Sequence, residues 1–436
     1  MGVFKIKGGN SLKGQIFPQG SKNESLQVLC ASLLTSDKVR IKNIPKIGDV
    51  KCLIKIIKNL GVIVKKNGER DYTFQAKDIN TEYLNTEKFR KHGKSIRGSI
   101  MIAGPLLTRL GKVYIPIPGG DRIGRRRLDA HLNGLKSLGG IIHYNNELKC
   151  FYLHSKNKLH GKYILMEEAS ITGTANIIMA STLAKGKTII YNAACEPYIQ
   201  QLCKMLNNMG AKIKGIGTNL LNITGVYELK GCIHTILPDM VEIGSWIGLA
   251  AITCSEICIK NVSWKNLGII PNVFEKMGIK INRKQDDIYI PFQKFYKIKK
   301  LLNNAILTIS DAPWPGLTPD LLSILTVVAT QAEGCVLIHQ KMFESRLFFI
   351  DNLIEMGAQI ILCDPHRATV IGLNHKSYLR GSILNSPDIR AGISLLIAAL
   401  SAKGTSIIKN IEQIERGYEN IELRLQSIGA NITRIE

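Results

Sequence analysis

Apolar residues in this chain gather in stretches that would be hydrophobic on every side of a helix. The stretch 393–400, Ile-Ser-Leu-Leu-Ile-Ala-Ala-Leu, is one example. A helix that is apolar all round is a buried helix. A turn and a short run of β-branched residues follow such stretches, as in 184–192 and 402–410. The pattern therefore predicts buried helices, each followed by a strand.

Two further patterns repeat along the chain. In the first, a glycine follows Leu, Met or Ile and precedes a β-rich run, at intervals of roughly 70 to 80 residues: Gly61, Gly139, Gly210, Gly278, Gly357 and Gly429. Glycine is the expected residue just past a helix, where a positive φ costs little. In the second, Leu-x-Gly precedes a predicted strand, at 12–14, 159–161, 229–231 and 379–381.

Together the patterns predict six copies of one unit, in the order strand, buried helix, strand, outer helix, strand. Six units divide naturally into three plus three. We therefore predict an α/β fold of two similar domains, each with its helices buried inside a shell of sheets. The alternative is one long α/β barrel with coincidental spacing, which the agreement of three patterns disfavours.

Composition narrows the class of protein. The chain has 436 residues, of which 21% are charged, a low share for a disordered chain. No apolar run is long enough to span a bilayer, and residues 1–7 lack the apolar core of a secretory signal. The ten cysteines form no CxxC pair, and the nine histidines show no metal-binding spacing. We expect a reduced, cytoplasmic protein without a metal site and without a membrane partner.

The net charge of +24 has three competing explanations. Nucleic-acid binding is one, but the chain has no long Lys/Arg run and no basic motif interleaved with aromatic residues. Binding of anionic metabolites is the second. The third is an AT-rich genome that favours Lys, Ile and Asn. We favour the second and third together, and expect no nucleic-acid partner.

Polar residues concentrate where the buried helices are predicted to begin: 20–24, 95–99, 169–174, 238–242, 318–320 and 387–390. Free backbone N–H groups and the helix dipole make such ends natural anion sites. Ser21, Ser170 and Thr172 are explained equally well as N-caps. Capping does not explain three cations at these starts, because cations oppose the dipole: Lys22, Arg97 and Arg390. Each of the three requires an anion or a nearby carboxylate.

A glycine-rich loop, 118–127, is a second candidate binding element. It reads Pro-Gly-Gly-Asp-Arg-Ile-Gly-Arg-Arg-Arg. Its glycines allow the backbone to approach a ligand, and its arginines suit bidentate phosphate contacts. It lacks the GK[ST] of a Walker loop, so nucleotide hydrolysis is not implied. Other charged loops follow at 195–197, 343–346 and 415–418.

These motifs resemble the enolpyruvyl transferases, and within them those that act on UDP-N-acetylglucosamine. The resemblance runs from about Phe4 to Arg434, and these segments carry it: 20–23, 118–124, 237–239, 343–346 and 416–419. It implies an inside-out α/β barrel, with two domains of three repeats each and the first strand packed with the C-terminal domain. The expected domains are residues 22–237 and residues 1–21 with 238–436, with the active site in the cleft between them.

The resemblance also implies a reaction and the residues that carry it. The sugar 3′-hydroxyl attacks C2 of phosphoenolpyruvate while C3 is protonated, and the tetrahedral ketal then loses phosphate. The positions matching the phosphoenolpyruvate site are Lys22, Asn23, Arg126, Arg346, Arg390 and Arg416. Those matching the nucleotide-sugar site are Asn23, Arg97, Arg127, Ser170, Thr172, Glu196 and Asp320. The catalytic positions are Lys22, Asp121, Arg126, Asp320, Asp388 and Arg416.

Within this set, Asp320 matches a general base and Asp388 a carboxylate beside the developing cation. No organic cofactor is implied. Asp121 stands where the family most often has the cysteine that serves as general acid and is alkylated by fosfomycin. We expect a fosfomycin-insensitive enzyme in which Asp121 gains its proton only beside bound phosphoenolpyruvate. Glu168 and Arg127 also depart from the common pattern, where Lys and Pro are frequent.

Three rival functions remain. A transferase acting on shikimate 3-phosphate would share the fold and the arginines, but segments 20–23 and 118–120 favour the nucleotide-sugar enzyme. A basic nucleic-acid-binding repeat protein leaves the carboxylates Asp239, Asp320 and Asp388 unexplained, because they would repel a phosphate backbone. A structural scaffold leaves the polar helix starts unexplained. The sequence does not indicate an oligomeric state.

Overall fold

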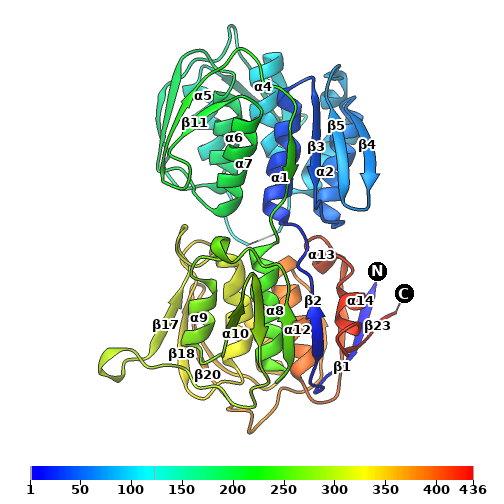
Figure 1. Ribbon diagram of the computed structural model, residues 1–436, viewed down its shortest axis with the longest axis vertical. Coiled ribbons are helices and arrows are strands. Elements are labelled where there is room, and N and C mark those ends of the chain that lie inside the picture. Colours follow the sequence, from blue (N-terminus) through cyan, green and yellow to red (C-terminus); the bar gives the residue numbers. More distant parts are fainter. Residues whose placement is uncertain (1, 122, 436) are drawn as a thin grey trace. The chain divides into compact units, whose positions relative to one another are not determined.

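The computed structural model describes residues 2–121 and 123–435, and its contacts divide the chain into two compact units (Figure 1). Unit 2 consists of residues 20–121 and 126–237. Unit 1 contains the described residues before position 20, those from 238 onward, and the short loop piece 123–125. Each unit has three separate sheets of its own. Among the described residues, no helix combines the length and apolar character needed to cross a membrane.

Unit 2 is built from three sheets and the helices that accompany them. The sheets are β13(Ile233–Thr235)–β3(Lys38–Lys42)–β5(Asp71–Gln75)–β4(Ile63–Gly68), β9(Tyr163–Leu165)–β10(Lys187–Tyr191)–β12(Leu220–Thr224)–β11(Lys212–Lys214) and β6(Lys112–Pro116)–β8(Cys150–His154)–β7(Ile141–Asn145). The α-helices are α1(Lys22–Ala31), α2(Gly48–Asn59), α3(Glu87–Ser95), α4(Ala103–Leu110), α5(Asp129–Ser137), α6(Ile171–Ser181) and α7(Pro197–Asn208). The 3-10 helices are η1(Ser32–Leu34), η2(Glu82–Asn85) and η3(Arg97–Ile102).

Unit 1 repeats this plan. Its sheets are β2(Lys13–Ile16)–β14(Glu256–Ile259)–β16(Asp287–Ile290)–β15(Asn282–Lys284), β17(Leu307–Ser310)–β18(Cys335–His339)–β20(Arg367–Ile371)–β19(Gln359–Asp364) and β21(Ile383–Asn385)–β22(Thr405–Lys409)–β1(Val3–Lys7)–β23(Asn431–Ile435). The α-helices are α8(Met240–Ile252), α9(Ile270–Lys276), α10(Leu322–Ala329), α11(Ile350–Glu355), α12(Ile389–Ser401), α13(Glu412–Glu415) and α14(Ile421–Gln426). The 3-10 helices are η4(Trp264–Asn266), η5(Leu302–Asn304) and η6(Pro319–Leu321).

The six sheets follow one pairing scheme. In five of them a first strand lies parallel to the second, and two antiparallel strands complete the sheet, as in β17–β18–β20–β19. The sheet β6–β8–β7 has the antiparallel part of this scheme. The predicted α/β class and the sixfold repetition are confirmed. The predicted order of elements was one strand short, because the outer helix leads into a hairpin, such as β4–β5 or β11–β12, rather than a single strand.

The N-terminal strand completes the last sheet. β1 lies between β22 and β23 and is antiparallel to both, so residues 3–7 occupy the place that a hairpin partner fills in the other repeats. The resemblance implied this pairing of the first strand with the C-terminal part of the chain. The next strand, β2, pairs with β14 of unit 1, while β13 pairs with β3 of unit 2. As far as the described residues show, none of the six sheets closes on itself.

The cores consist of helices that are buried on all sides, as the hydrophobic pattern predicted. Every residue of α8, α10 and α12 is buried. Most of their few hydroxyl side chains donate back to a carbonyl of the preceding turn, as Ser394 does to Arg390 O at 2.8 Å, whereas Ser323 donates across to Arg390 O of α12. Helices α8 and α10 pack so closely that a Cβ on Gly248 would lie 2.4 Å from the Ile324 side chain. The polar groups that such helices contribute therefore concentrate at their ends.

The ends of the helices also match their sequence signals. All six glycines of the first repeated pattern have a positive φ, between +88° at Gly61 and +103° at Gly210. At the other end, Ser21, Ser170, Asp239 and Asp388 cap α1, α6, α8 and α12 by accepting backbone N–H groups. The N-cap interpretation of Ser21 and Ser170 is therefore confirmed. Thr172 is different, because its hydroxyl hydrogen-bonds to a histidine.

Candidate functional site

The residues expected at the active site fall into two sets, one in each unit. Those in unit 1 are Asp320, Arg346, Asp388, Arg390 and Arg416, and those in unit 2 are Lys22, Asn23, Arg97, Asp121, Arg126, Arg127, Ser170, Thr172 and Glu196. Most of them stand at or beside the start of a buried helix or in the glycine-rich loop. We describe the contacts of each set within its own unit.

The unit 1 set centres on one carboxylate shared by two arginines. Asp320 lies in η6, directly before buried α10, and its Oδ1 accepts a hydrogen bond of 2.6 Å from Arg346 Nη2. Its Oδ2 lies 3.0 Å from Arg390 Nη2. The side chains of Arg346 and Arg390 are 9% and 6% exposed. The cluster therefore holds two positive charges against the carboxylate of Asp320.

Arg346 has further N–H donors beyond the one that contacts Asp320. Its Nε and Nη1 are buried and have no hydrogen-bond partner among the described residues. Its guanidinium also lies over the Phe343 ring, 5.2 Å from the ring centre. Buried donors without acceptors are costly, and guanidinium groups pair best with planar or tetrahedral oxyanions. The arrangement suits an anionic ligand.

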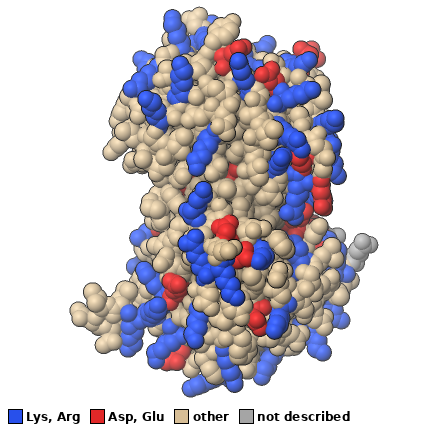
Figure 2. Space-filling model, viewed as in Figure 1, with Lys and Arg blue, Asp and Glu red and all other residues tan. Residues whose placement is uncertain are grey.

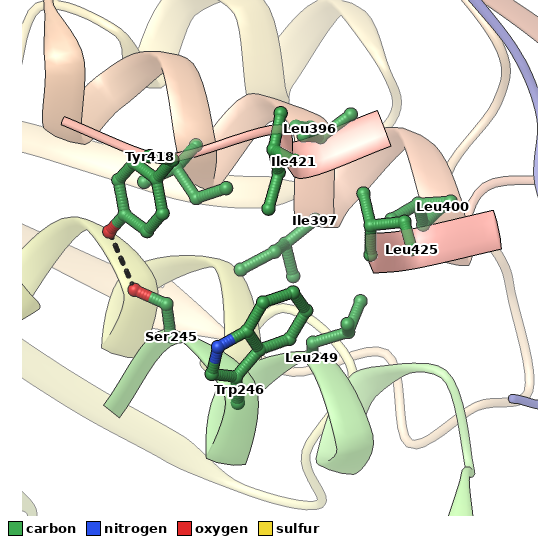
Figure 3. Close-up of a pocket in the computed structure, with 10 residues that line it drawn as sticks. Ser245, Trp246, Leu249, Leu396, Ile397, Leu400, Tyr418, Ile421 and Leu425 are labelled. Atoms are coloured by element: carbon green, nitrogen blue, oxygen red, sulfur yellow. Dashed lines mark hydrogen bonds between the residues drawn. The ribbon is translucent and has the colours of Figure 1, made fainter. Parts of the chain in front are cut away.

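Arg390 is held from its other side by a directed chain of hydroxyl groups. Arg390 Nη1 donates to Tyr418 Oη at 3.2 Å, and Tyr418 Oη lies 2.8 Å from Ser245 Oγ. Ser245 donates in turn to Val241 O, so the tyrosine hydrogen points to Ser245. Figure 3 shows this hydroxyl pair at the edge of a small cavity that is otherwise lined by apolar side chains such as Trp246. The cavity lies within the helix packing, whereas the charges lie at the helix start.

Charge and burial act in opposite directions on these buried groups. Burial lowers the pKa of Arg390, but the nearby carboxylates of Asp320 and Asp239 outweigh it, so the pKa is raised and the guanidinium stays charged. Burial raises the pKa of Tyr418 to about 12, although the Arg390 cation opposes this shift. The tyrosine therefore remains a neutral hydroxyl that can both accept and donate.

The remaining unit 1 residues stand close by in sequence. Asp388 caps α12 by accepting from the backbone N–H groups of Arg390 (2.7 Å) and Ala391 (3.0 Å). Arg416 Nη1 donates to Gln413 Oε1 at 2.8 Å. Asp388 is thus tied to the same helix start that carries Arg390, which fixes one carboxylate and one guanidinium on a single turn.

The glycine-rich loop contributes to both units. In unit 1, the N–H of Arg125 donates to Glu344 Oε2 at 3.0 Å, and a Cβ on Gly124 would lie 2.0 Å from the same oxygen. In unit 2, Gly119 packs against the Lys94 carbonyl, where a Cβ would lie 1.8 Å away. The backbone contact therefore requires glycine at position 119, and a φ of +116° favours it at position 124. Asp121 and Arg126 of this loop are partly exposed.

In unit 2, the cation at the start of α1 has a carboxylate partner. Lys22 Nζ lies 2.8 Å from Asp49 Oδ2, and both side chains are largely buried. Asp49 lies in the first turn of α2. A lysine at a helix start opposes the helix dipole, and a buried carboxylate offsets that cost. The sequence predicted that an anion or a carboxylate was needed here but not which residue supplies it.

Arg97 contacts backbone carbonyls rather than the anion or carboxylate that the sequence led us to expect. Its Nη2 donates to the backbone carbonyls of Arg126 (2.7 Å) and Arg127 (3.0 Å). Burial, and after it the cation of Arg126, lower the pKa of Arg97 to about 10, while Glu168 raises it. Arg97 therefore remains charged at neutral pH and fixes the end of the glycine-rich loop through its backbone.

The Thr172 hydroxyl is oriented by a chain that begins at two backbone groups. The N–H of Gly104 donates to Asn176 Oδ1 at 2.6 Å, and Asn176 Nδ2 donates to Ile100 O at 3.0 Å. A backbone N–H can only donate and a carbonyl can only accept, so these two contacts fix the orientation of the amide. Asn176 Nδ2 then also donates to His131 Nδ1, at 3.1 Å.

This orientation determines the tautomer of His131. Because Nδ1 accepts, the proton of the neutral ring is on Nε2, which lies 3.0 Å from Thr172 Oγ1 and donates to it. Burial, and after it the Arg97 cation, lower the pKa of His131 to about 3, so the ring is neutral at ordinary pH. The hydrogen of the Thr172 hydroxyl is thus left to be donated to another acceptor at the start of α6.

The other unit 2 residues are placed as follows. Ser170 caps α6 by accepting the N–H of Gly173 at 3.3 Å. Glu196 is buried at the start of α7, where its carbonyl accepts the first helical hydrogen bonds. Arg127 is exposed and pairs with Asp129 at 3.0 Å. Asn23 lies in the first turn of α1 and is half-buried.

On the face shown in Figure 2, Lys and Arg side chains are scattered over both units and interspersed with a few acidic ones. Across the residues described, no cluster of three His, Cys, Asp or Glu side chains could hold a metal ion.

Sequence reasoning missed four residues that the structure places beside the expected ones: Asp49, His131, Asn176 and Ser245. Each is a buried polar residue inside or beside an apolar helical stretch. A polar residue at such a position is itself a signal, because it must find a partner. The sequence does not say which partner.

The fold is that of the enolpyruvyl transferases. Two solved structures share this fold across nearly the whole chain. The enolpyruvyl transferase NikO from Streptomyces tendae superimposes with a TM-score of 0.85 at 20% identity, covering 99% of this chain and 98% of that one. EPSP synthase from Acinetobacter baumannii gives a TM-score of 0.76 at 17% identity, covering 100% of both chains.

The sequence comparisons are more specific. The family model for EPSP synthase (3-phosphoshikimate 1-carboxyvinyltransferase) matches residues 6–425, and the chain belongs to this family. A relative from Bacteroides thetaiotaomicron, named UDP-N-acetylglucosamine 1-carboxyvinyltransferase, is 61% identical over 435 residues and covers 100% of both chains. A relative of the same name from Treponema denticola is 47% identical and covers 99% of both. The resemblance inferred from the motifs is confirmed.

We predict that His131 is a neutral ring with its proton on Nε2 and stays so down to acid pH. Nitrogen-15 NMR of histidine-labelled protein should show an unprotonated Nδ1 and a protonated Nε2, unchanged from about pH 8 to about pH 5. The resonances of His131 are identified as those that disappear in the variant His131→Gln. Because the folded-state pKa lies below the ordinary 6.5, the contribution of the neutral ring to stability is present above about pH 6.5 and is lost as the pH falls toward about 3. A proton found on Nδ1 would reverse the donor assignment of Thr172.

Proposed function

We propose that this chain transfers the enolpyruvyl group of phosphoenolpyruvate to the 3′-hydroxyl of UDP-N-acetylglucosamine and releases phosphate. The observation that carries the proposal is the unit 1 cluster, in which Arg346 and Arg390 share Asp320, and two buried donors of Arg346 have no partner among the described residues. The names of full-length relatives at 47–61% identity support the choice of acceptor. The reaction would serve peptidoglycan precursor synthesis in the cytoplasm.

In the first step, the sugar hydroxyl adds to C2 of phosphoenolpyruvate. Asp320, whose oxygens contact Arg346 and Arg390, takes the hydroxyl proton. Asp121 delivers a proton to C3. Arg346 and Arg390 bind the carboxylate and phosphate, which positions C2 for attack.

In the second step, Asp121 takes a proton back from C3 and the tetrahedral ketal loses phosphate, which leaves with the proton that Asp320 held; the C=C bond is restored as an enol ether. Positive charge develops at C2 in both steps, and Asp388, fixed at the start of α12, stabilises it. Lys22, Asn23, Arg126 and Arg416 complete the binding of the phosphate and carboxylate. The substrates carry their own activation, so the proposal includes no organic cofactor and no metal.

The nucleotide sugar is assigned to the unit 2 set. Its diphosphate and carbonyl oxygens are acceptors, and the start of α6 offers donors: the backbone N–H groups and the hydroxyl hydrogen of Thr172. The companions in this set are Asn23, Arg97, Arg127, Ser170 and Glu196, with Asp320 from unit 1. The chemistry requires both sets to act on the same pair of substrates, as the cleft expected from the sequence implies. We also propose that each unit has the inside-out α/β barrel architecture that the family resemblance implies.

The deciding experiment is phosphate release from phosphoenolpyruvate, with UDP-N-acetylglucosamine or shikimate 3-phosphate as acceptor in parallel reactions. We expect release only with the nucleotide sugar. Release only with shikimate 3-phosphate would keep the fold and the chemistry but move the acceptor to the one that the family description names. Release with neither would refute the proposal, and a salt titration of nucleic-acid binding would follow.

Thr172→Val should weaken binding of the nucleotide sugar, because valine has the same shape and no hydroxyl. We expect KM for UDP-N-acetylglucosamine to rise about tenfold, the size of one hydrogen bond, with KM for phosphoenolpyruvate unchanged. Thr172→Ser is the matched control and should retain affinity. Equal affinities for the Val and Ser variants would show that the hydroxyl does not contact the sugar nucleotide.

Asp121 should make the enzyme insensitive to fosfomycin. The drug alkylates a thiolate, and a carboxylate is a far weaker nucleophile. We expect no time-dependent loss of activity in the natural chain and progressive inactivation of the variant Asp121→Cys. Intact-protein mass spectrometry should show the drug attached to the variant only. Asp121→Asn should lose most of its turnover; full turnover in that variant would exclude Asp121 as the acid.

A further inference from the structure

The segment 291–306, between β16 and β17 of unit 1, has a composition unlike its surroundings. It contains four lysines, at 294, 297, 299 and 300, and no Asp or Glu occurs anywhere from 288 to 310. Five of its apolar side chains are exposed: Phe292, Phe295, Leu301, Leu302 and Ile306. Leu302 is 90% exposed, which is unusual for a leucine in an ordered loop. We call residues 291–306 the projecting segment.

Hydrogen bonds to the core of unit 1 hold the base of the projecting segment. Tyr296 is fully buried and donates its hydroxyl to Val328 O at 2.7 Å. The Gln293 amide accepts from Lys280 N and donates to Gly278 O. The N–H of Glu333 donates to Tyr296 O, and the carbonyl of Glu333 accepts from Ile298 N. Tyr296 and Ile298 thus point into the core, whereas the neighbouring residues Phe295 and Lys297 are exposed.

The tip of the segment is a closed turn. Leu301 N donates to Ala305 O at 3.0 Å, and the short helix η5 lies inside this turn. Asn303 and Asn304 both adopt φ of +58°, a conformation that asparagine tolerates better than other non-glycine residues. The turn therefore displays Leu301 and Leu302 outward. In Figure 1 it is the yellow-green loop that extends beyond β17 and β18, and in Figure 2 the same projection carries tan atoms at its end with blue ones beside them.

The charges around the tip are almost all positive. Lys299 and Lys300 directly precede it, and Lys276, whose carbonyl accepts from Lys299 N, is exposed as well. Lys297 pairs with Glu333, which brings one carboxylate to the base of the segment. Lys294 lies over the Phe295 ring, 5.3 Å from its centre. A cationic rim around an apolar tip is complementary to a surface with anionic head groups over a hydrocarbon layer.

We propose that the projecting segment docks this protein onto an anionic lipid bilayer, with Leu301 and Leu302 inserted at the head-group boundary and the lysines above on the phosphates. The tip itself is aliphatic, and leucines stack on no nucleobase, so the tip fits a lipid surface better than a nucleic acid, although Phe292 and Phe295 nearer the base are exposed as well. The inference departs from the sequence expectation of no membrane partner. It does not depend on the transferase activity, because none of these residues belongs to the site described above.

The test is co-sedimentation of the full chain with vesicles of phosphatidylcholine containing about one quarter phosphatidylglycerol. We expect binding to these vesicles, weaker binding as sodium chloride is raised, and little binding to pure phosphatidylcholine. Leu302→Asp should lower partitioning at least about tenfold, and the double variant Lys299→Glu/Lys300→Glu should do the same. The positions are exposed, so the thermal unfolding midpoint and phosphate release should stay unchanged.

A matched control distinguishes the effect of the projecting segment on vesicle binding from the effect of the net charge of the protein. Lys65→Glu/Lys66→Glu changes two exposed lysines of β4 in unit 2 and shifts the net charge equally. It should retain vesicle binding. An equal loss in both double variants would show that binding follows net charge and would overturn the proposal, as would full binding by Leu302→Asp. Concentration-dependent self-association in analytical ultracentrifugation, abolished by Leu302→Asp, would instead identify a second copy of the chain as the partner.

Discussion

Enclosure of helices on all sides is the constraint on which this structure depends. A helix with no exposed face, such as α8 or α12, must satisfy its backbone internally and carry apolar side chains along its length. Its first turn still offers N–H groups without helical partners. Charged residues can therefore stand at the starts of such helices and almost nowhere else on them. The clustering of Asp320, Asp388 and Arg390 at helix starts follows from the architecture before any chemistry is considered.

The same constraint explains how the site is held in place. Each cation at a helix start has a partner: Asp49 for Lys22, Asp320 (shared with Arg346) for Arg390, and two loop carbonyls for Arg97. Breaking a buried pair is far more costly than forming it is favourable, so these contacts act mainly by fixing geometry. The chain from Gly104 through Asn176 and His131 to Thr172 shows the same principle without net charge. A backbone group at one end dictates which way a hydroxyl points at the other.

Much of this could be predicted from the sequence, and the rest could not for physical reasons. Periodic glycines and all-apolar stretches predict the repeats, because both are local consequences of helix ends and burial. The second strand of the hairpin, such as β12 or β16, was missed because none of the repeated sequence patterns marks it. The need for a partner at Lys22 and Arg390 was foreseen, but Asp49 and Asp320 are distant in sequence. Which buried polar groups meet is a property of packing, and one sequence does not state it.

The pairing of β1 between β22 and β23 determines the order in which the chain can fold as it is made. Unit 2 has all three of its sheets once residue 237 has left the ribosome, whereas the last sheet of unit 1 needs strands from both ends of the chain. The N-terminal strand must therefore wait, unpaired, through most of translation. Its alternating pattern places the exposed residues Lys5 and Lys7 directly after the apolar residues Phe4 and Ile6, so the unpaired strand carries two charges during that wait. Chaperone dependence of the nascent chain would follow from this delay rather than from any weakness of the finished fold.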